Sequence, residues 1–161
     1  MALDCHTSIA SKQDLDQVVH CWKHLTIELP LHHIQPFGKR LHEHLDQELR
    51  PTAEQCIARD DAQVWILKSH KDRLLGTVSV VLNTQIGYSQ PNSGVIFNLW
   101  VFPDSRGRGY GQVLVAEAKK WLRSQGATSI QAGWHPGNTQ ADRFWKKQGF
   151  EAYETIAASK L

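Results

Sequence analysis

The stretch that most constrains the fold of this chain is the junction between residues 95 and 124. An apolar run, VIFNLWV, is followed within a few residues by RGRGYG and then by a good helix former, QVLVAEAKKWL. β-Branched and aromatic runs of this kind are typical of buried strands, and Gly126 stands where a helix C-cap is expected. The sequence therefore predicts a strand at 95–101, a glycine-rich loop at 106–111 and a helix over Gln112–Ser124.

Similar short apolar runs lie on both sides of this junction. VWIL at 64–67 and LLGTVSVVL at 74–82 predict two further strands, which form a meander with 95–101 through one tight turn and one loose turn. After the helix, SIQAGW at 129–134 predicts a strand, ADRFWKKQ at 141–148 a helix, and FEAYETIAA at 150–158 a last strand.

The first 60 residues have a helical pattern. Ser11 and Asp14 form a capping box before apolar residues at helical spacing, which predicts a helix over 12–24. The segment IELPLHHIQPFG at 27–38 predicts a loop, because it contains two prolines and a glycine. Apolar residues at every fourth position from Phe37 predict a second helix ended by Pro51, and Thr52 is the expected cap of a short third helix through Ala58.

The predicted order is two or three helices, three strands, helix, strand, helix, strand. This indicates a mixed α/β (α+β) protein with one layer of sheet, because the steady strand–helix alternation of a doubly wound fold is missing. At 161 residues the chain has the length of a single domain.

The glycine-rich loop has three competing interpretations. A dinucleotide fingerprint needs GxGxxG with an acid about 20 residues on, and a P-loop needs GxxxxGK[ST]; the spacing here is GxGxG, and neither string occurs. The third interpretation is a turn without a ligand. Position favours an anion site: unpaired N–H groups and the helix dipole meet at a helix start, and glycines let the amides close around a diphosphate. Arg106 and Arg108 are expected to add positive charge.

Composition limits the class of partner. The formal net charge is +2 and 21% of residues are charged, so the basic excess of a nucleic-acid binder is missing, and no apolar run is long enough to span a membrane. Three distant cysteines form neither a CxxC pair nor a zinc spacing, which is typical of reduced thiols in a cytoplasmic protein. We therefore expect a soluble protein that binds neither nucleic acid nor membrane.

Two motifs together resemble the GNAT superfamily of N-acyltransferases. RGRGYG at 106–111 is similar to the family's (Arg/Gln)-x-x-Gly-x-(Gly/Ala) motif, and LWVFP at 99–103 is similar to the Leu-Tyr-Val-x-Pro that precedes it. NTQADRFWKKQGF at 138–150 is similar to Asn-x-x-Ala-x-x-x-Tyr-x-x-x-Gly-Phe, in the right order and at the right separation. The resemblance covers about residues 63 to 155.

The resemblance implies a fold and a cosubstrate. The fold would be a mostly antiparallel sheet, splayed at the two strands that flank a coenzyme A site, with helices on both faces. Residues 1–161 would form one acyltransferase domain, with a helical acceptor-side region at 1–60 and a coenzyme-binding core at 63–155. The cosubstrate would be acetyl-CoA, with its pantetheine arm along the strand at Leu99 and Val101. The implied coenzyme-binding residues are Leu99, Val101, Arg106, Gly107, Arg108, Gly109, Tyr110, Gly111, Gln112 and Asn138.

The catalytic groups depart from the family's pattern. Acyl transfer to an amine needs an oxyanion donor, for which a backbone N–H near Val101 is expected, and a proton for the thiolate. The family's tyrosine acid is replaced by Trp145, whose indole cannot deliver a proton, and the strand offers Asn98 where many members have a glutamate base. His135 is the candidate base because of its intrinsic pKa range.

Histidines and acids outside the two motifs are candidates for metal or acceptor binding. His20, His24, His42 and His44 form no HExxH string, so we expect solvated or capping residues and no metal. His32 and His33 lie where the family often borders its acceptor pocket. A polycationic acceptor such as an aminoglycoside would need acids, and the candidates are Glu28, Glu43, Asp46 and Glu48.

The main hypothesis is an N-acetyltransferase that works by direct transfer, because no cysteine lies in either motif. The acceptor is open among an aminoglycoside, a protein N-terminus, a lysine and a small amine. Dimers are common in the family, so a homodimer is one expected state. The alternative is a non-catalytic acyl-CoA-binding or regulatory module, which Trp145 and the missing glutamate favour.

Overall fold

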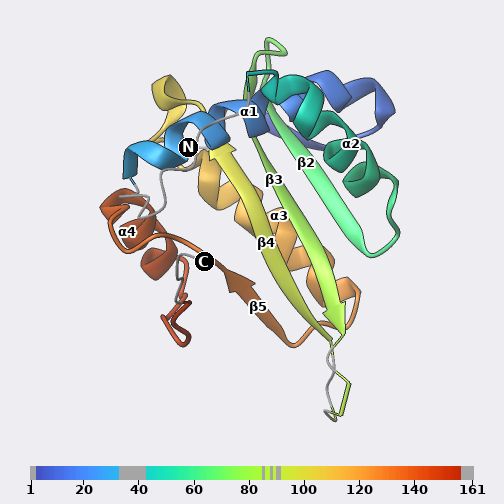
Figure 1. Ribbon diagram of the computed structural model, residues 1–161, viewed down its shortest axis with the longest axis vertical. Helices are drawn as coiled ribbons and strands as arrows, with labels where there is room; N and C mark the ends of the chain where they lie inside the picture. Colours follow the sequence, from blue (N-terminus) through green and yellow to red (C-terminus); the bar gives the residue numbers. More distant parts are fainter. Residues whose placement is uncertain (1–2, 33–42, 85, 88, 90–91, 157–161) are drawn as a thin grey trace.

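A computed structural model describes residues 3–32, 43–84, 86–87, 89 and 92–156. Five strands form one sheet in the order β1-β2-β3-β4-β5, in which neighbours are antiparallel except for the parallel pair β4–β5 (Figure 1). The strands are β1 (Cys5–Ile9), β2 (Ala62–Ser69), β3 (Leu74–Thr84), β4 (Asn92–Val101) and β5 (Ser129–Ala132), and the α-helices are α1 (Leu15–His32), α2 (Leu45–Ala58), α3 (Tyr110–Ser124) and α4 (Thr139–Lys147), with 3₁₀ turns η1 (Lys12–Asp14) and η2 (Pro103–Ser105).

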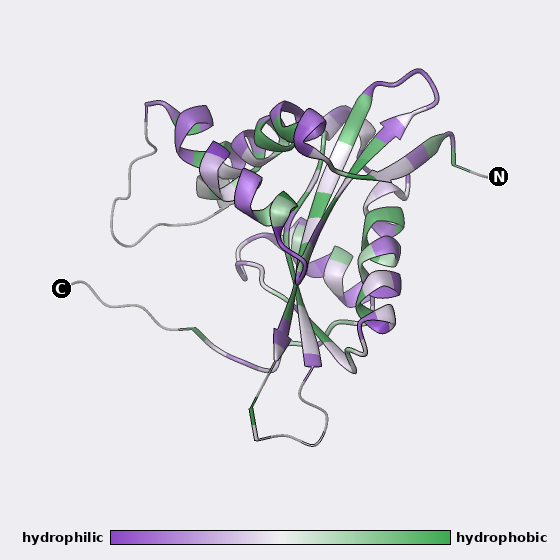
Figure 2. Cartoon of the chain, turned by 90° about the vertical axis from the view of Figure 1, so that its right-hand side faces the viewer, coloured by the Kyte–Doolittle hydropathy of each residue, from purple (hydrophilic) through white to green (hydrophobic). Residues whose placement is uncertain are grey.

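Helices cover both faces of the sheet, as predicted. Figure 2 shows the strands nearly edge-on, with α1 and α2 on one side and α3 on the other. One apolar cluster packs α3 and α4 against the sheet, and it includes Leu75, Val80 and Leu114. A second cluster lies under α1 and α2 and includes Val18, Trp22 and Ile66. Burial of apolar surface on both faces explains why the central strands are continuous hydrophobic runs.

The three-strand meander and the helix after the glycine loop are confirmed. β2, β3 and β4 pair in sequence, with a tight turn at 70–73 between β2 and β3. Gly126 follows α3 with φ of +75°, the left-handed conformation expected at a glycine that ends a helix. α3 begins at Tyr110, two residues earlier than the sequence predicts.

The predicted loop at 27–38 is wrong for residues 27–32, because α1 continues through Pro30 to His32. Proline removes one helical N–H, but the helix is held by packing of the stripe that includes Val18, Cys21 and Trp22, all of which are buried. Residues 33–42 lie outside the described part of the chain, and so do Phe37 and Leu41 of the predicted second helix.

The predicted break at Pro51 is also wrong. A single helix, α2, runs from Leu45 to Ala58 with Pro51 inside it. Ala53 and Cys56 are buried after the proline, and Leu49 packs against the same cluster before it. Tertiary packing on both sides of Pro51 therefore offsets the lost hydrogen bond.

Two further differences between the predicted and the observed strands concern β1 and the segment 150–156. β1 was not expected, because its sequence CHTSI is mainly polar; it is an edge strand held by its antiparallel pairing with β2. The last strand predicted at 150–158 is wrong for 150–156, which form neither strand nor helix. Tyr153 and Ile156 are 71% and 91% exposed, so this segment has the composition of a strand but no packed face. Residues 157 and 158 lie outside the described part.

Candidate functional site

The glycine-rich loop joins β4 to α3 through η2. Gly107 and Gly109 have φ of +75° and +85°, which side chains with a Cβ rarely adopt. Gly109 is the N-cap of α3, and a Cβ on Gly107 would meet nothing within 4 Å. Across the described residues, the backbone N–H groups of 107–111 donate to no acceptor. Unpaired amides at a helix start are typical of anion sites, so this geometry suits the site that the sequence predicts.

Three residues where the loop passes into α3 have packing or hydrogen-bonding roles within the protein. A Cβ on Gly111 would lie 3.0 Å from the Phe144 ring, so this glycine allows close packing of α3 against α4. The Gln112 N–H already donates to the Gly109 carbonyl at 3.0 Å. Tyr110 is buried in the core. The amides of 107–109 are therefore the ones whose geometry is set by left-handed glycines.

The two arginines of the loop differ. Arg106 donates from Nε to the Val101 carbonyl at 2.8 Å and pairs through both terminal nitrogens with the Glu28 carboxylate, each at 2.9 Å. Its guanidinium also lies 4.6 Å from the centre of the Trp100 ring. Arg108 is exposed and has no partner in the described part of the chain. Positive charge was expected from both arginines. The charge of Arg106 is balanced by Glu28, whereas no described residue balances that of Arg108.

β4 and β5 separate at the point where the coenzyme arm was expected. β5 pairs only with Ser93–Ile96, so no described strand covers the β5 side of β4 from 97 to 101. The register of β4 on β3 shifts between Thr77 and Ser79, where two residues of β4 stand opposite one residue of β3. Asn98 lies at this bulge with φ of +49°. A bulge bends a strand and re-aims its peptide groups, which opens this edge.

The peptide groups of Val101 point into this opening. Phe102 donates to the Leu75 carbonyl at 3.0 Å, so the neighbouring pair, Gly76 and Val101, is the non-hydrogen-bonded pair of the antiparallel ladder. The Val101 N–H and carbonyl are therefore directed away from β3, toward the side that β5 leaves uncovered. This is the geometry expected of a donor to a developing oxyanion.

Asn138 and His135 lie in the turn between β5 and α4. Asn138 is the N-cap of α4, and its Oδ1 accepts from the Ala141 N–H at 3.0 Å. The Nδ2 group has no partner in the described part of the chain, so it can donate to a ligand. His135 accepts the Gly137 N–H on Nδ1 at 2.9 Å, and its carbonyl accepts from the Asn138 N–H at 2.8 Å. In the neutral ring the proton is therefore on Nε2.

Trp145, at the position of the family's tyrosine, is a core residue. It is 6% exposed and lies within ring-contact distance of Trp134, Phe144 and Phe150, with centroids 6.3, 5.1 and 4.9 Å away. Trp134 in turn donates from its indole to Asp142 at 3.1 Å. Hydrogen bonds from Lys146 and Trp134 hold the pKa of Asp142 below its usual range.

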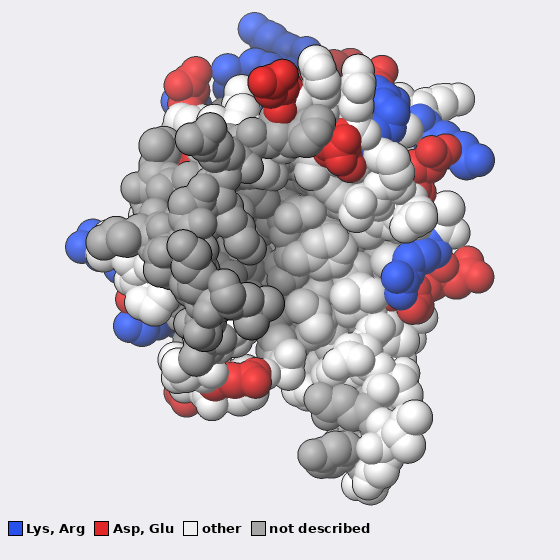
Figure 3. Space-filling view, in the orientation of Figure 1, with Lys and Arg blue, Asp and Glu red and all other residues white. Residues whose placement is uncertain are grey.

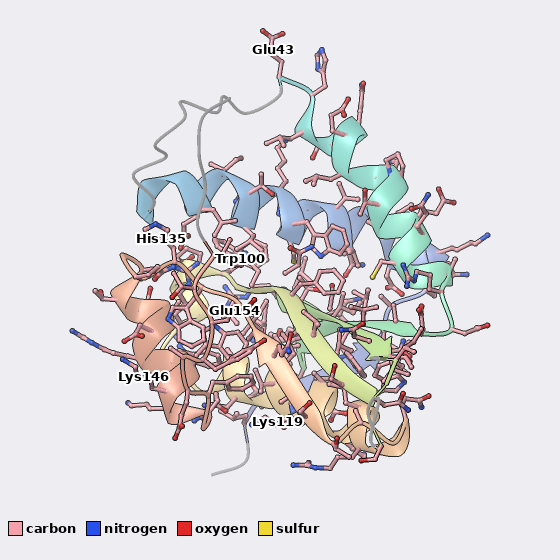
Figure 4. The ribbon with its side chains drawn as sticks, turned by 60° about the horizontal axis from the view of Figure 1, so that its bottom comes forward. Glu43, Trp100, Lys119, His135, Lys146 and Glu154 are labelled. Atoms are coloured by element: carbon pink, nitrogen blue, oxygen red, sulfur yellow. The ribbon has the colours of Figure 1, made fainter. Side chains whose placement is uncertain are left out.

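The α1 histidines form an aromatic group with the end of β4. His24 stacks on Trp100 with centroids 6.2 Å apart, and both His20 and His24 contact Phe102. Burial, together with the charges of His20 and Lys23, lowers the pKa of His24. Trp100 is buried between α1 and the sheet, as Figure 4 shows. In the described part of the chain, no three His, Cys, Asp or Glu residues lie close enough to hold a metal.

The four candidate acids do not gather into one pocket. Glu28 pairs with Arg106, and Asp46 pairs with Lys23 at 2.7 Å. Glu43 projects away from the body at the start of α2 (Figure 4), and Glu48 is exposed. Charges of both signs alternate around the margin of the face in Figure 3. His33 lies outside the described residues.

The buried cysteines bear on whether the acyl group could pass through a thiol. Cys21 and Cys56 are buried, and burial raises the pKa of Cys21 to about 12, so neither presents a thiolate as an acyl carrier. No described helix combines the length and apolarity of a membrane span.

The chain is similar to known proteins in sequence and in fold. A sequence profile of the Acetyltransferase (GNAT) family matches residues 28–150, whereas no curated protein sequence matches the chain. Similar solved structures include a predicted acetyltransferase with acetyl-CoA from Clostridium acetobutylicum (TM-score 0.78, 16% identity, 97% of this chain and 96% of that one). A GCN5-related N-acetyltransferase from Ralstonia eutropha JMP134 has a TM-score of 0.74 at 15% identity, covering 97% and 98%.

A third similar structure is that of AAC(6')-Iy in complex with the bisubstrate analog CoA-S-monomethyl-acetylneamine, with a TM-score of 0.72 at 17% identity over 98% and 97% of the two chains. At these identities the structures support the fold, which is the mixed sheet with helices on both faces described above. The family profile covers more than half of the chain and includes both motifs and the loop that joins β4 to α3. This chain belongs to the GNAT acetyltransferase family.

Proposed function

We propose that the protein transfers an acetyl group from acetyl-CoA to a primary amine. The observation that carries the proposal is the combination of unpaired amides at 107–111 with the open edge of β4 directly before them. A diphosphate on the loop and an extended arm along the uncovered strand edge have the relative positions of the two halves of coenzyme A. The structures similar to this chain include proteins solved with acetyl-CoA and with a CoA bisubstrate analog.

In this proposal the coenzyme-binding core comprises residues 63–155. Amides of 107–111 and Arg108 bind the pyrophosphate, the edge of β4 at Leu99 and Val101 pairs with the pantetheine arm, and Asn138 Nδ2 donates to it. Residues 1–60 contribute the acceptor side. The face in Figure 3 carries charges of both signs and the formal net charge is +2, which supports a small-molecule or peptide amine rather than nucleic acid as the acceptor.

The transfer is direct. The amine nitrogen attacks the thioester carbonyl carbon, the new C–N bond forms, and the C–S bond breaks to release the CoA thiolate. The Val101 N–H stabilises the oxyanion of the tetrahedral intermediate. His135 is the proposed base for the amine proton; its Nδ1 becomes available when the Gly137 hydrogen bond opens. Solvent or the substrate protonates the thiolate, because an indole at position 145 cannot.

The alternative is a non-catalytic acyl-CoA-binding module. Two observations favour it: Trp145 is buried in the core at the tyrosine position, and Asn98 stands at the bulge where many members have a glutamate base. Such a module would use the same loop and strand edge to hold acetyl-CoA but would turn over no amine.

Calorimetric and thermal titration with acetyl-CoA, followed by thiol release in the presence of amines, tests both functions. Ligand at about 100 times its Kd adds about 2.7 kcal/mol of stability, roughly 5–10 °C in Tm for a domain of this size. The amines are an aminoglycoside, a peptide with a free N-terminus, a lysine peptide and small polyamines. Stabilisation with turnover supports the enzyme, stabilisation without turnover on any amine supports the module, and the absence of binding contradicts both.

A further inference from the structure

An ion pair between Glu28 and Arg106 connects the acceptor-side region to the coenzyme-binding core. Glu28 lies in the last part of α1, and Arg106 opens the glycine-rich loop 78 residues later. Their side chains are 23% and 25% exposed, so the pair is largely shielded from water. A bidentate pair between a carboxylate and a guanidinium fixes the plane of both groups, which a lysine or a single hydrogen bond would not do.

The Arg106 guanidinium makes two contacts with β4, one before and one after the Val101 N–H along the chain. Its Nε donates to the Val101 carbonyl at 2.8 Å, and its carbon lies 4.6 Å from the Trp100 ring centre. The Val101 N–H lies between these two contacts along the chain. Trp100 is itself held from α1, because His24 stacks on it. Among the described residues, Arg106 rather than a neighbouring strand therefore fixes the open edge of β4.

We propose that Glu28 is a positioning residue for acetyl transfer: it holds Arg106 on β4 and so fixes the Val101 N–H that receives the oxyanion. This inference rests on the proposed function. It also assigns Arg106 a different task from phosphate binding, because its charge is balanced by Glu28 and its Nε is committed to β4. The charge that reaches the pyrophosphate then comes from Arg108 and the amides of the loop.

A purely structural pair would anchor α1 and do nothing else, and the two roles differ in what they change. Loss of an anchor lowers stability and leaves the chemistry of the folded protein unchanged. Loss of a positioning contact leaves most of the binding of the CoA moiety, because the pyrophosphate amides and the β4 edge at Leu99 are unaffected, but it misplaces the Val101 donor in the transition state. A misplacement of about 1 Å is enough to cost about 100-fold in rate.

The test compares wild type with Glu28→Gln, which keeps the size of the side chain, and Glu28→Asp, which keeps the charge but shortens the reach. Asp16→Asn is the matched control, because it removes another ion pair to α1, that with Arg50, at an acid that is not among the candidates for acceptor binding. The measurements are Tm, calorimetric Kd values for CoA and acetyl-CoA, and kcat with the most active amine of the panel. The Arg106 Nε–H signal in ¹⁵N NMR reports the hydrogen bond to the Val101 carbonyl, and this measurement needs no amine substrate.

We expect kcat of both Glu28 variants to fall about 10- to 100-fold, with Kd for CoA within about 2-fold of wild type and altered exchange of the Arg106 Nε–H. Asp16→Asn should keep wild-type kcat. The proposal is overturned if Glu28→Gln keeps wild-type kcat, or if its Kd for CoA changes as much as kcat does, which would place Arg106 on the phosphates. A wild type that binds acetyl-CoA without turnover would refute the positioning role and leave the binding module; one that binds no acetyl-CoA would refute the proposed function itself.

Discussion

Gly76 of β3 and Trp100 of β4 pack backbone against backbone: a Cβ on Gly76 would lie 2.3 Å from the Trp100 carbonyl oxygen. The contact occurs next to the bulge at Asn98, where β4 bends toward its uncovered edge. Neither strand can yield, since both are central in the sheet. The absence of a side chain at position 76 is therefore a condition for the shape of β4 at the candidate site.

We expect Gly76→Ala to lose about 3 kcal/mol of unfolding free energy, because overpacking against backbone forces the strands apart. For a domain of this size this corresponds to roughly 6–12 °C in Tm. Gly133→Ala is the control, since a Cβ there would meet nothing within 4 Å and its φ is not positive. Thermal unfolding followed by circular dichroism checks both. A Gly76→Ala protein as stable as Gly133→Ala would show that the close contact does not exist.

The pyrophosphate assignment predicts a loss of binding at Gly107 that backbone strain cannot explain. Gly107 and Gly87 have φ of +75° and +94°, and a Cβ at either would meet nothing within 4 Å. Valine strains the backbone at both positions by about 1–2 kcal/mol. Only at position 107 would it also fill the space in front of the amides. We expect Gly107→Val to weaken CoA binding by more than about 100-fold and Gly87→Val to leave it within about 2-fold. Equal Kd values for the two variants would remove the loop from the coenzyme site.

Much of this site could be predicted from the sequence, because its elements are local. A strand, two left-handed glycines and a helix start follow one another along the chain, so their geometry depends on neighbours and on the conformations that glycine permits. The same is true of Asn138 as a helix N-cap. The φ of +49° at Asn98 was missed, although an asparagine inside an apolar strand was a usable signal, since asparagine tolerates that conformation better than most residues.

What the sequence could not show depends on distant contacts. The pairing of Glu28 with Arg106 spans 78 residues and has no periodic pattern, and its partner acid was indistinguishable from Glu43 or Glu48. The helices at Pro30 and Pro51 were missed for the same reason: proline disfavours a helix locally, but packing against the sheet decides. The strand predicted at 150–156 is wrong for the opposite reason. Its composition favours a strand locally, but in the described part of the chain no neighbouring strand pairs with it.

Trp145 is expected to have a structural role and no catalytic one. Its ring lies between Trp134 and Phe150 and is 6% exposed. Trp145→Phe should cost about 1–3 kcal/mol through lost contacts, with kcat at 25 °C within about 3-fold of wild type. Guanidinium unfolding measures the stability loss, and steady-state thiol release measures kcat. A fall of 100-fold in kcat without loss of stability would mean that the indole takes part in the chemistry.

His24 should titrate below the ordinary histidine value of 6.5, because burial, His20 and Lys23 all disfavour its charged form. Above pH 6.5 both the folded and the unfolded chain hold it neutral, so it has no effect on stability there. As the pH falls through 6.5, the unfolded chain takes up the proton first, and the folded state loses stability until the pH is below the pKa of folded His24. NMR titration should show this low pKa, and His20→Gln should raise it. A His24 pKa at or above 6.5 would contradict the packing on Trp100.

His135→Asn tests the proposed base while keeping the turn. Asparagine Oδ1 can accept the Gly137 N–H in place of His135 Nδ1, so the start of α4 should be retained and Tm should change by little. If His135 takes the amine proton, kcat should fall about 100- to 10,000-fold. Binding of CoA should stay within about 2-fold, because the ring is not among the proposed coenzyme contacts. A variant with wild-type kcat would limit His135 to its hydrogen bond with Gly137 and assign proton removal to solvent or to the acceptor.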